Sequence, residues 1–197
     1  MITGIILASG FSKRMGEDKL LMNVKGKQMV EWVIIASKKS SLDRILLIYR
    51  SEKVKEVGEI YNIETIFNPK APLGQSEAMK LGVRKAIDSD AYMFLLADQP
   101  FINPQLIDKL IDQYKKNRTS ILVPYYNGQK GTPTIFPSVY KNELLKIQGD
   151  KGGRDIIRKN PASIVRVDIY EEKMGFDIDS PGDFEIISDK INPYNDK

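Results

Sequence analysis

Short apolar runs, often β-branched, alternate along the chain with stretches in which apolar residues recur at helical spacing. The apolar runs predict strands at 2–8, 43–49, 63–68, 91–97, 121–125 and 164–168, with a further extended segment at 132–136. The amphipathic stretches predict helices at 28–39, 52–61, 76–88, 104–116, 137–147, 152–159 and from 179 onward. Because strands that alternate with helices require crossover connections, we expect a single α/β domain with a mainly parallel central sheet.

The pattern shows no internal repeat and no linker, so we expect one domain over residues 1–191. The polar tail 192–197 is expected to be frayed. Asn103 precedes Pro104 at the start of a predicted helix, where asparagine suits the N-cap and proline the first turn.

Composition narrows the chemistry that the chain can carry out. The 197 residues include no cysteine and no histidine, which excludes disulfides, thiolate nucleophiles, zinc knuckles and imidazole bases. The net charge is only +4, and basic and acidic residues are interleaved, so we expect neither nucleic-acid nor membrane binding. The apolar N-terminus lacks a basic region and indicates a first strand rather than a signal peptide. The expected location is therefore the cytoplasm.

The first predicted strand continues into a segment that combines small and basic residues, Leu7-Ala8-Ser9-Gly10-Phe11-Ser12-Lys13-Arg14-Met15-Gly16-Glu17-Asp18-Lys19. A glycine-containing turn at this position can bring backbone N–H groups close to phosphate oxygens. Lys13, Arg14 and Lys19 would then supply the positive charge that a triphosphate requires. The spacing matches neither a dinucleotide-binding pattern nor a P-loop. A phosphate site and an ordinary solvated turn both stay open from the residues alone.

Two acidic positions are candidates for a metal site. Asp98 directly follows the predicted central strand, and ligands bind at the carboxyl ends of strands in open α/β sheets. A carboxylate there suits Mg²⁺, although it could instead cap the loop before Pro100. Near the C-terminus, Asp177 and Asp179 share one side of an extended segment, so either could join Asp98 on the cation. Asp179 could equally cap the final helix.

Two further segments combine glycine with polar side chains. The first, Gly74-Gln75-Ser76, opens a predicted helix and would place amides and a hydroxyl near a ligand, although most such turns only begin a helix. The second is Gly149-Asp150-Lys151-Gly152-Gly153-Arg154, for which a flexible surface loop is the default interpretation.

Taken in chain order, these segments resemble the MobA-like nucleotidyltransferases, most closely the molybdenum cofactor cytidylyltransferases. The resemblance rests on six motifs that span nearly the whole chain: Leu7-Ala8-Ser9-Gly10-x-Ser12-x-Arg14-Met15-Gly16-x-x-Lys19, Gly74-Gln75-Ser76, Ala97-Asp98-Gln99-Pro100, Gly131-x-Pro133, Gly149-Asp150-x-Gly152-x-Arg154 and Asp177-Ile178-Asp179-Ser180-Pro181-x-Asp183. It implies a Rossmann-like, three-layer α/β/α fold of the GT-A nucleotidyltransferase type.

The resemblance also implies a reaction and a set of roles. A substrate phosphate would attack the α-phosphate of a nucleoside triphosphate and release pyrophosphate, with Mg²⁺ as cofactor. The implied nucleotide-binding residues are Leu7, Ala8, Ser9, Gly10, Lys19, Gly74, Gln75 and Ser76. The implied catalytic residues are Arg14, Lys19 and Asp98, and the implied metal ligands are Asp98 and Asp179. The implied acceptor-binding residues are Gln99, Pro100, Thr132, Asp150 and Arg154.

This chemistry is compatible with the missing histidines, because a substrate phosphate is already ionised. Displacement at phosphorus then needs positioning and charge neutralisation rather than an imidazole base.

Two positions depart from the family pattern. In the resemblance, Leu-Ala-Gly-Gly openings go with guanylyl transfer and Leu-Ala-Ala-Gly openings with cytidylyl transfer, and Ser9 is nearer the second. Thr132 stands where cytidylyltransferases of this type usually have the histidine of Gly-His-Pro, in a loop expected to face the pterin.

We therefore expect a Mg²⁺-dependent enzyme that transfers CMP from CTP to the phosphate of molybdopterin. The alternatives are a guanylyltransferase on the same acceptor, a cytidylyltransferase on a sugar or polyol phosphate, and a non-catalytic nucleotide-binding or cofactor-chaperone module. Thr132 favours the non-catalytic module, whereas Lys19, Asp98 and Asp179 argue against it. The sequence does not identify a molybdoenzyme or chaperone partner.

Overall fold

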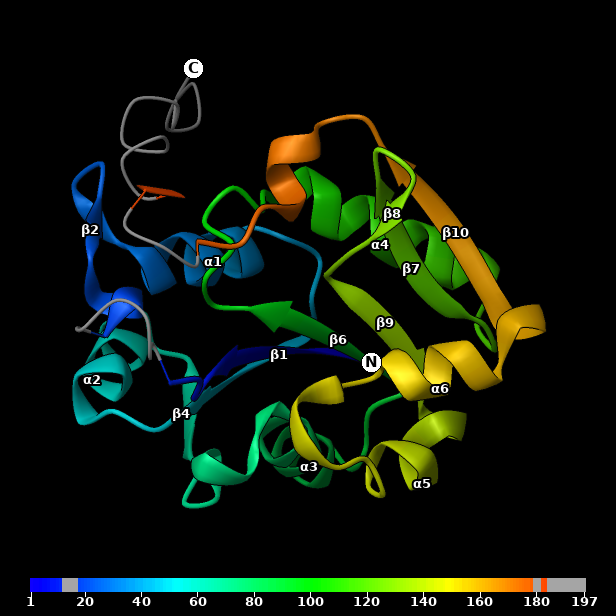
Figure 1. The fold of residues 1–197 in the computed structure, drawn as a ribbon, viewed down its shortest axis with the longest axis horizontal. Helices are drawn as coiled ribbons and strands as arrows, with labels where there is room; N and C mark the ends of the chain where they lie inside the picture. Colours follow the sequence, from blue (N-terminus) through cyan, green and yellow to red (C-terminus); the bar gives the residue numbers. More distant parts are fainter. Residues whose placement is uncertain (12–17, 179–181, 184–197) are drawn as a thin grey trace.

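An eight-stranded mixed sheet forms the centre of the molecule, in a computed structural model that describes residues 1–11, 18–178 and 182–183. The strand order is β10-β7-β9-β6-β1-β4-β5, with β8 paired to β7 (Figure 1). The strands are β1 Ile2–Ala8, β4 Arg44–Tyr49, β5 Glu64–Phe67, β6 Ala91–Leu96, β7 Ile121–Tyr126, β8 Gln129–Lys130, β9 Thr134–Pro137 and β10 Ile164–Ile169. β9 runs antiparallel to β6 and β7, whereas β1 is parallel to both β4 and β6. The predicted mainly parallel sheet is confirmed.

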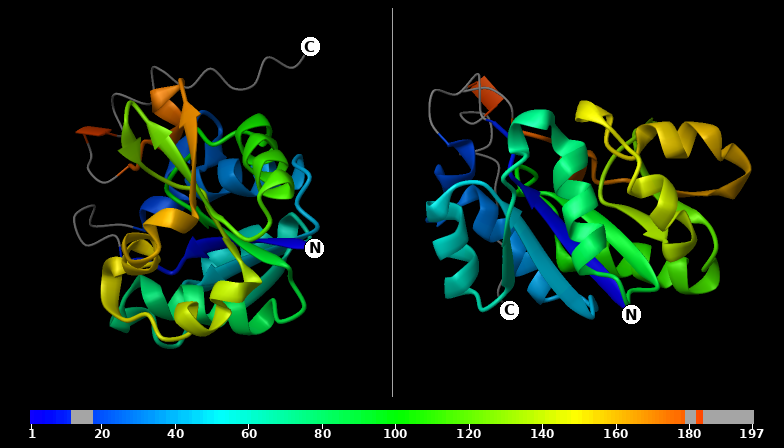
Figure 2. Two further views of the ribbon diagram at one scale, coloured as in Figure 1. Left: turned by 90° about the vertical axis from the view of Figure 1, so that its right-hand side faces the viewer. Right: turned by 90° about the horizontal axis from the view of Figure 1, so that it is seen from below.

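Helices cover both faces of this sheet (Figure 2). They are α1 Met29–Lys38, α2 Glu52–Ile60, α3 Gln75–Lys85, α4 Pro104–Lys116, α5 Lys141–Leu144 and α6 Arg154–Lys159. One hydrophobic cluster joins the sheet to α1, α2 and α4, and a second joins it to α3, α5 and α6. Successive residues of β1 enter opposite clusters, Ile6 the first and Ile5 the second, as strand alternation requires. The predicted three-layer α/β/α fold is confirmed.

The predicted start of α4 is confirmed, whereas another predicted helix is mostly wrong. Asn103 caps α4 by accepting the backbone N–H of Leu106 at 2.8 Å, and the helix begins at Pro104 as predicted. The helix predicted at 137–147 is wrong for most of its length. It is a 3-10 turn, Ser138–Tyr140, followed by the four residues of α5, and Pro137 belongs to β9. The apolar spacing arises there because Tyr140, Leu144 and Ile147 all pack into one cluster, not because the helix is continuous.

Short hairpins were not predicted. Asn23–Val24 and Lys27–Gln28 form the two-stranded β2-β3 sheet around a turn in which Lys25 and Gly26 have positive φ. These strands are too short and polar for an apolar pattern to show them. The helix predicted from 179 onward and the tail 192–197 lie outside the described residues, apart from residues 182 and 183.

The topology predicts a ligand site at the carboxyl ends of the central strands β1 and β6. From β1 the chain builds β4 and β5 on one side, and it then returns to place β6 on the other side. The strand order therefore reverses between β1 and β6, and ligands of open α/β folds bind outside the carboxyl ends of strands at such a point. Leu7 and Leu96 are register partners near those ends. Within the described ranges, no helix has the length and apolar character needed to cross a bilayer.

Candidate active site

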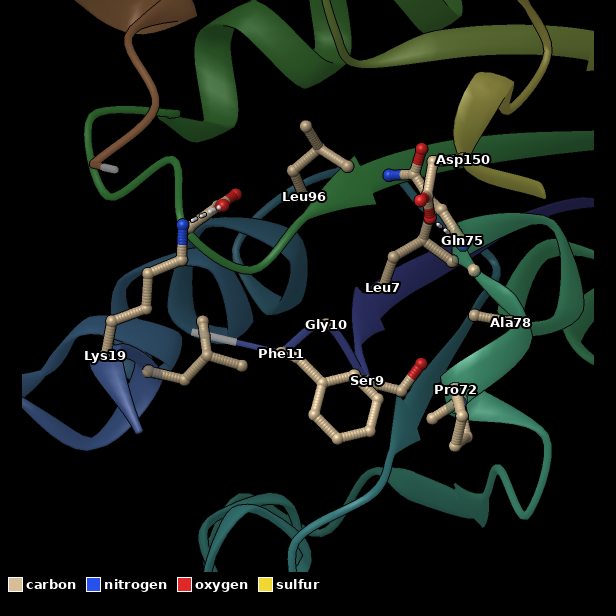
Figure 3. Close-up of a pocket in the computed structure, with 14 residues that line it drawn as sticks. Leu7, Ser9, Gly10, Phe11, Lys19, Pro72, Gln75, Ala78, Leu96 and Asp150 are labelled. Atoms are coloured by element: carbon tan, nitrogen blue, oxygen red, sulfur yellow. Dashed lines mark hydrogen bonds and ion pairs between the residues drawn. The ribbon is translucent and has the colours of Figure 1, made fainter. Parts of the chain in front are cut away.

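A cavity of about 370 Å³ opens at the carboxyl ends of β1 and β6 (Figure 3). This volume lies within the ordinary range for small-molecule sites. Its lining residues are Leu7, Ser9, Gly10, Phe11, Lys19, Leu20, Ala71, Pro72, Gly74, Gln75, Ala78, Leu96, Asp98 and Asp150. Residues 9–11 of the predicted phosphate-binding turn, the start of α3 and the predicted metal ligand Asp98 thus surround one space. Figure 3 shows Lys19 on one side of it and Gln75 with Asp150 on the other.

Lys19 and Asp98 form an ion pair at one end of the cavity. Lys19 Nζ lies 2.7 Å from Asp98 Oδ2, and the side chains are only 14% and 22% exposed. The same ammonium donates to the carbonyl of Ile178 at 2.8 Å, while the Ile178 N–H donates to the Asp98 carbonyl at 3.1 Å. Lys19 begins a 3-10 turn, Lys19–Leu21, in which Leu20 is buried. Strand β6 and this anchored turn bring the opposite charges together beside the cavity.

Ser9 is fixed by a residue that the sequence reasoning missed. Asn68, just after β5, donates from Nδ2 to Ser9 Oγ at 3.0 Å, and both residues are buried. Asn68 Oδ1 accepts the N–H of Lys70, which fixes the orientation of the amide. Since Ser9 Oγ already accepts a hydrogen bond, its own proton is left to donate to another group at the cavity wall. The Asn-Pro turn after a strand could have drawn attention to Asn68.

Arg50 was also missed, although it directly follows β4 at the same sheet edge. Its guanidinium donates to the Gly10 carbonyl at 3.3 Å and lies 3.5 Å from the Asp18 carboxylate. It also stacks over the Phe11 ring at 4.5 Å from the ring centre. Arg50 therefore ties the turn after β1 to the residue that precedes Lys19.

The start of α3 meets the 3-10 turn Gly149–Lys151. The Gln75 N–H donates to Asp150 Oδ1 at 3.1 Å, and Figure 3 shows this contact at the far side of the cavity from Lys19. Gly74 has a φ of +103°, and a Cβ added to it would lie 2.6 Å from Asp150 Oδ1. Asp150, predicted to bind the acceptor, is thus in contact with the turn predicted to bind the nucleotide.

Several predicted site residues do not face the cavity. Ser76 is 0% exposed, and its hydroxyl has no hydrogen-bond partner among the described residues. Gln99 is 2% exposed with its amide bonded to protein groups, and Pro100 is buried beside it. Arg154 is exposed at the start of α6 but does not line the cavity. Arg14 and Asp179 lie outside the described residues, so their predicted roles stay predictions.

Asp98 and Asp150 are the carboxylates that line the cavity among the described residues, and Asp98 is the one predicted to hold Mg²⁺. Nowhere in residues 1–11, 18–178 and 182–183 do three histidine, cysteine, aspartate or glutamate side chains gather. Mg²⁺, however, is ordinarily held by one or two carboxylates together with substrate phosphates, and the hard oxygens of Asp98 face the cavity. Asp177, the other candidate of the alternating pair, accepts a hydrogen bond from Gln99 at 2.6 Å.

The fold and the cavity define an open α/β protein with a polar site at the carboxyl ends of its central strands and a cation paired with a carboxylate at one end of that site. The chain belongs to the MobA-like NTP transferase domain family, whose model matches residues 4–164, and it is a nucleotidyltransferase. The expected family is thereby confirmed.

Among curated relatives, the chain is 29% identical over 143 residues to a probable molybdenum cofactor guanylyltransferase of Natranaerobius thermophilus, covering 72% of this chain and 67% of that one. It is 26% identical over 198 residues to the purine catabolism protein PucB of Bacillus subtilis, covering 94% and 95%. Among solved structures, the manganese complex of Rv0371c from Mycobacterium tuberculosis superposes with a TM-score of 0.80 at 19% identity, covering 96% and 99%. That likeness supports the fold.

Proposed function

We propose that this nucleotidyltransferase transfers a nucleoside monophosphate to the phosphate of the molybdenum cofactor in a metal-dependent reaction. The observation that carries the proposal is the Lys19–Asp98 pair, 2.7 Å apart, at the end of a cavity bounded by the turn after β1 and by the start of α3. In the reaction, an oxygen of the acceptor phosphate forms a bond to the α-phosphorus. The bond from the α-phosphorus to the bridging oxygen breaks, and pyrophosphate leaves.

The residues around the cavity supply what this displacement needs. The backbone N–H groups after β1 would face the triphosphate, and Lys19 would neutralise charge that develops on the phosphate oxygens. Asp98 would hold Mg²⁺, which when bound draws negative charge from the phosphate oxygens. The manganese complex of Rv0371c, a protein of the same fold, supports a divalent cation here. No residue has to act as a general base, because the attacking phosphate is already ionised.

The names of relatives support the acceptor and change the expected nucleotide. The relatives from Natranaerobius thermophilus and Thermococcus sibiricus are both named as probable molybdenum cofactor guanylyltransferases, each 29% identical to this chain. We therefore place GTP before CTP as the donor. CTP stays the second candidate because the Leu7-Ala8-Ser9-Gly10 opening is nearer the cytidylyl pattern. A cytoplasmic location stays a prediction.

Pyrophosphate release with each of GTP, CTP, ATP and UTP tests this proposal. The reactions contain Mg²⁺ and molybdenum-loaded molybdopterin, and the Asp98→Ala protein serves as the control. We expect pyrophosphate release above the control to be strongest with GTP. In matched reactions, pyrophosphate release from the triphosphate with a sugar or polyol phosphate as acceptor, but not with molybdopterin, would show that the acceptor is a different phosphate. Tight triphosphate binding without turnover on any acceptor would overturn the proposal in favour of a non-catalytic module.

A further inference from the structure

We infer that Thr132 and Gln99 are positioning residues, which hold residues 175–178 against Asp98 and so keep Lys19 and Asp98 in place for the proposed reaction. The inference rests on the proposed function for its catalytic meaning. Its structural part rests on contacts alone.

The first contact satisfies the oxygen of the Gln99 amide. Thr132 Oγ1 donates to Gln99 Oε1 at 2.7 Å, so the amide oxygen points to Thr132 and the amide nitrogen to the opposite side. Gln99 is 2% exposed, so water does not offer an equivalent partner. Without this hydroxyl the buried amide oxygen of Gln99 would lose its partner, and a buried acceptor left unsatisfied costs more than a hydrogen bond contributes on average.

The second set of contacts holds the segment that crosses Asp98. Gln99 Nε2 donates to Asp177 Oδ1 at 2.6 Å and to the Gly175 carbonyl at 3.4 Å. If the amide were reversed, its oxygen would face the Asp177 carboxylate, and two acceptors would meet without a proton between them. The Asp177 carboxylate and the Gly175 carbonyl can only accept, so they keep the amide nitrogen on their side, and the Thr132 hydroxyl supplies the donor that the amide oxygen needs on the other side.

Tyr126 holds the other side of residues 131–133, called the Thr132 loop below. Its hydroxyl donates to the Thr132 carbonyl at 2.6 Å. Burial, and after it the charge of Asp177, raises the pKa of Tyr126, so the phenol keeps its proton for this bond. A Cβ on Gly131 or on Gly175 would lie 2.5 Å from the Tyr126 ring, so both loops pack tightly against it. The Thr132 loop and residues 175–178 thus share one support.

The segment ends at the charged pair of the active site. Ile178, one residue beyond Asp177, donates its N–H to the Asp98 carbonyl at 3.1 Å and accepts Lys19 Nζ at 2.8 Å. A continuous series of hydrogen bonds therefore runs from Thr132 through Gln99 and the segment to Lys19. Partners that orient the groups around a metal commonly change affinity or activity by about 10- to 100-fold when removed.

These contacts give Thr132 a supporting role that does not depend on contact with a ligand. Its hydroxyl is directed to Gln99 and not into the cavity, which Thr132 does not line. The residue that departs from the expected Gly-His-Pro pattern is therefore built into the support of Asp98. Its presence is compatible with an active enzyme.

The test compares Thr132→Val, which keeps the shape but loses the hydroxyl, with Thr132→Ser, which keeps the hydroxyl. The first measurement is hydrogen exchange of the Ile178 amide, which the Asp98 carbonyl protects. We expect exchange at least about tenfold faster in Thr132→Val and within about twofold of wild type in Thr132→Ser. Equal exchange in all three proteins would overturn the inference, whether or not the proposed reaction occurs.

The second measurement is the affinity for α,β-methylene GTP and for the corresponding CTP analogue, each with Mg²⁺ and with a chelator. We expect Thr132→Val to lower the gain from Mg²⁺ by about tenfold while the affinity in chelator stays nearly unchanged. If wild type binds neither analogue, the proposed function fails, and the exchange experiment still decides the structural part. If exchange changes but the Mg²⁺ gain does not, the assigned role toward Asp98 is wrong.

A paired variant separates positioning from general destabilisation. Gln99→Glu places a second carboxylate against Asp177, and we expect it to reproduce the Thr132→Val effects. Adding Asp177→Asn restores a donor opposite the new carboxylate and should recover Ile178 protection and most of the Mg²⁺ gain. A loss that the second substitution does not recover, with the melting temperature of the single variant unchanged, would contradict the proposed contact.

Discussion

Lys19 Nζ and Asp98 Oδ2 lie 2.7 Å apart at the edge of a cavity that both residues line. Both side chains are largely shielded from water, which strengthens their mutual attraction relative to an exposed pair. Lys19 Nζ also donates to the Ile178 carbonyl, and the backbone carbonyl of Asp98 accepts the Ile178 N–H. A triphosphate with its cation would therefore meet positioned groups rather than freely moving ones.

Replacing Asp98 by asparagine should remove most metal-dependent activity. Asparagine has nearly the same shape, but it lacks the negative charge that would hold Mg²⁺ and that now pairs with Lys19. We expect pyrophosphate release to fall by about 10²-fold or more. The matched control is Asp108→Asn on α4, whose carboxylate is partly buried, accepts the Ser41 N–H and does not line the cavity. An Asp98→Asn rate near that of wild type would rule out the proposed metal ligand.

Replacing Lys19 by alanine should lower turnover more than it weakens nucleotide binding. The ammonium is placed to neutralise charge that grows during displacement, and such groups act mainly on kcat. We expect kcat to fall by about 10²-fold and KM to change by only a few-fold. Lys109→Ala is a suitable control, because Lys109 also donates to a carbonyl, that of Asp168, but does not line the cavity. A change confined to KM would assign Lys19 to ground-state binding.

The sequence predicted the parts of the site that depend on strand ends. Ser9 and Asp98 follow β1 and β6, and once the strands are recognised as neighbours at a topological switch point, their nearness follows. The same reasoning could have found Arg50, which follows β4 at that edge.

The contacts that support these residues could not be predicted in this way. Asn68 reaches Ser9, and Gln99 reaches Asp177, across long stretches of sequence, and each contact depends on how loops pack after the sheet has formed. Asp150 illustrates the same limit. The family resemblance implied that Asp150 binds the acceptor. In the structure, the 3-10 turn that contains Asp150 packs on Gly74, and this packing brings Asp150 to the start of α3.

Tyr61 should make stability fall with pH in the alkaline range. Its hydroxyl donates to Glu31 at 2.6 Å, and burial, with this hydrogen bond second, raises its pKa from 10.0 to about 12. Because the raised pKa belongs to the folded state, its stabilisation is complete below the unfolded value and is lost as pH rises from about 10 to about 12. Urea unfolding should show a smaller loss over this range in Tyr61→Phe than in wild type. Tyr170→Phe, at a tyrosine that is 88% exposed, is the control, and equal slopes in all three would contradict the prediction.

Gly74→Ala should weaken nucleotide binding beyond what its effect on stability explains. Gly74 has φ +103° and ψ 175°, a combination that is essentially confined to glycine, and Gly128 has φ +79°, so alanine introduces backbone strain of about 1–3 kcal/mol at both positions. Only at Gly74 does the added methyl group meet other atoms, with Asp150 Oδ1 at 2.6 Å and the Gly149 carbonyl carbon at 2.7 Å, whereas Gly128 faces open space. The 3-10 turn Gly149–Lys151 must then move and release the Gln75 N–H at the cavity wall. We expect both variants to melt a few degrees lower but only Gly74→Ala to bind triphosphate at least about tenfold more weakly by calorimetry. Equal affinities in the two variants would show that the contact between this turn and α3 is not needed for the nucleotide.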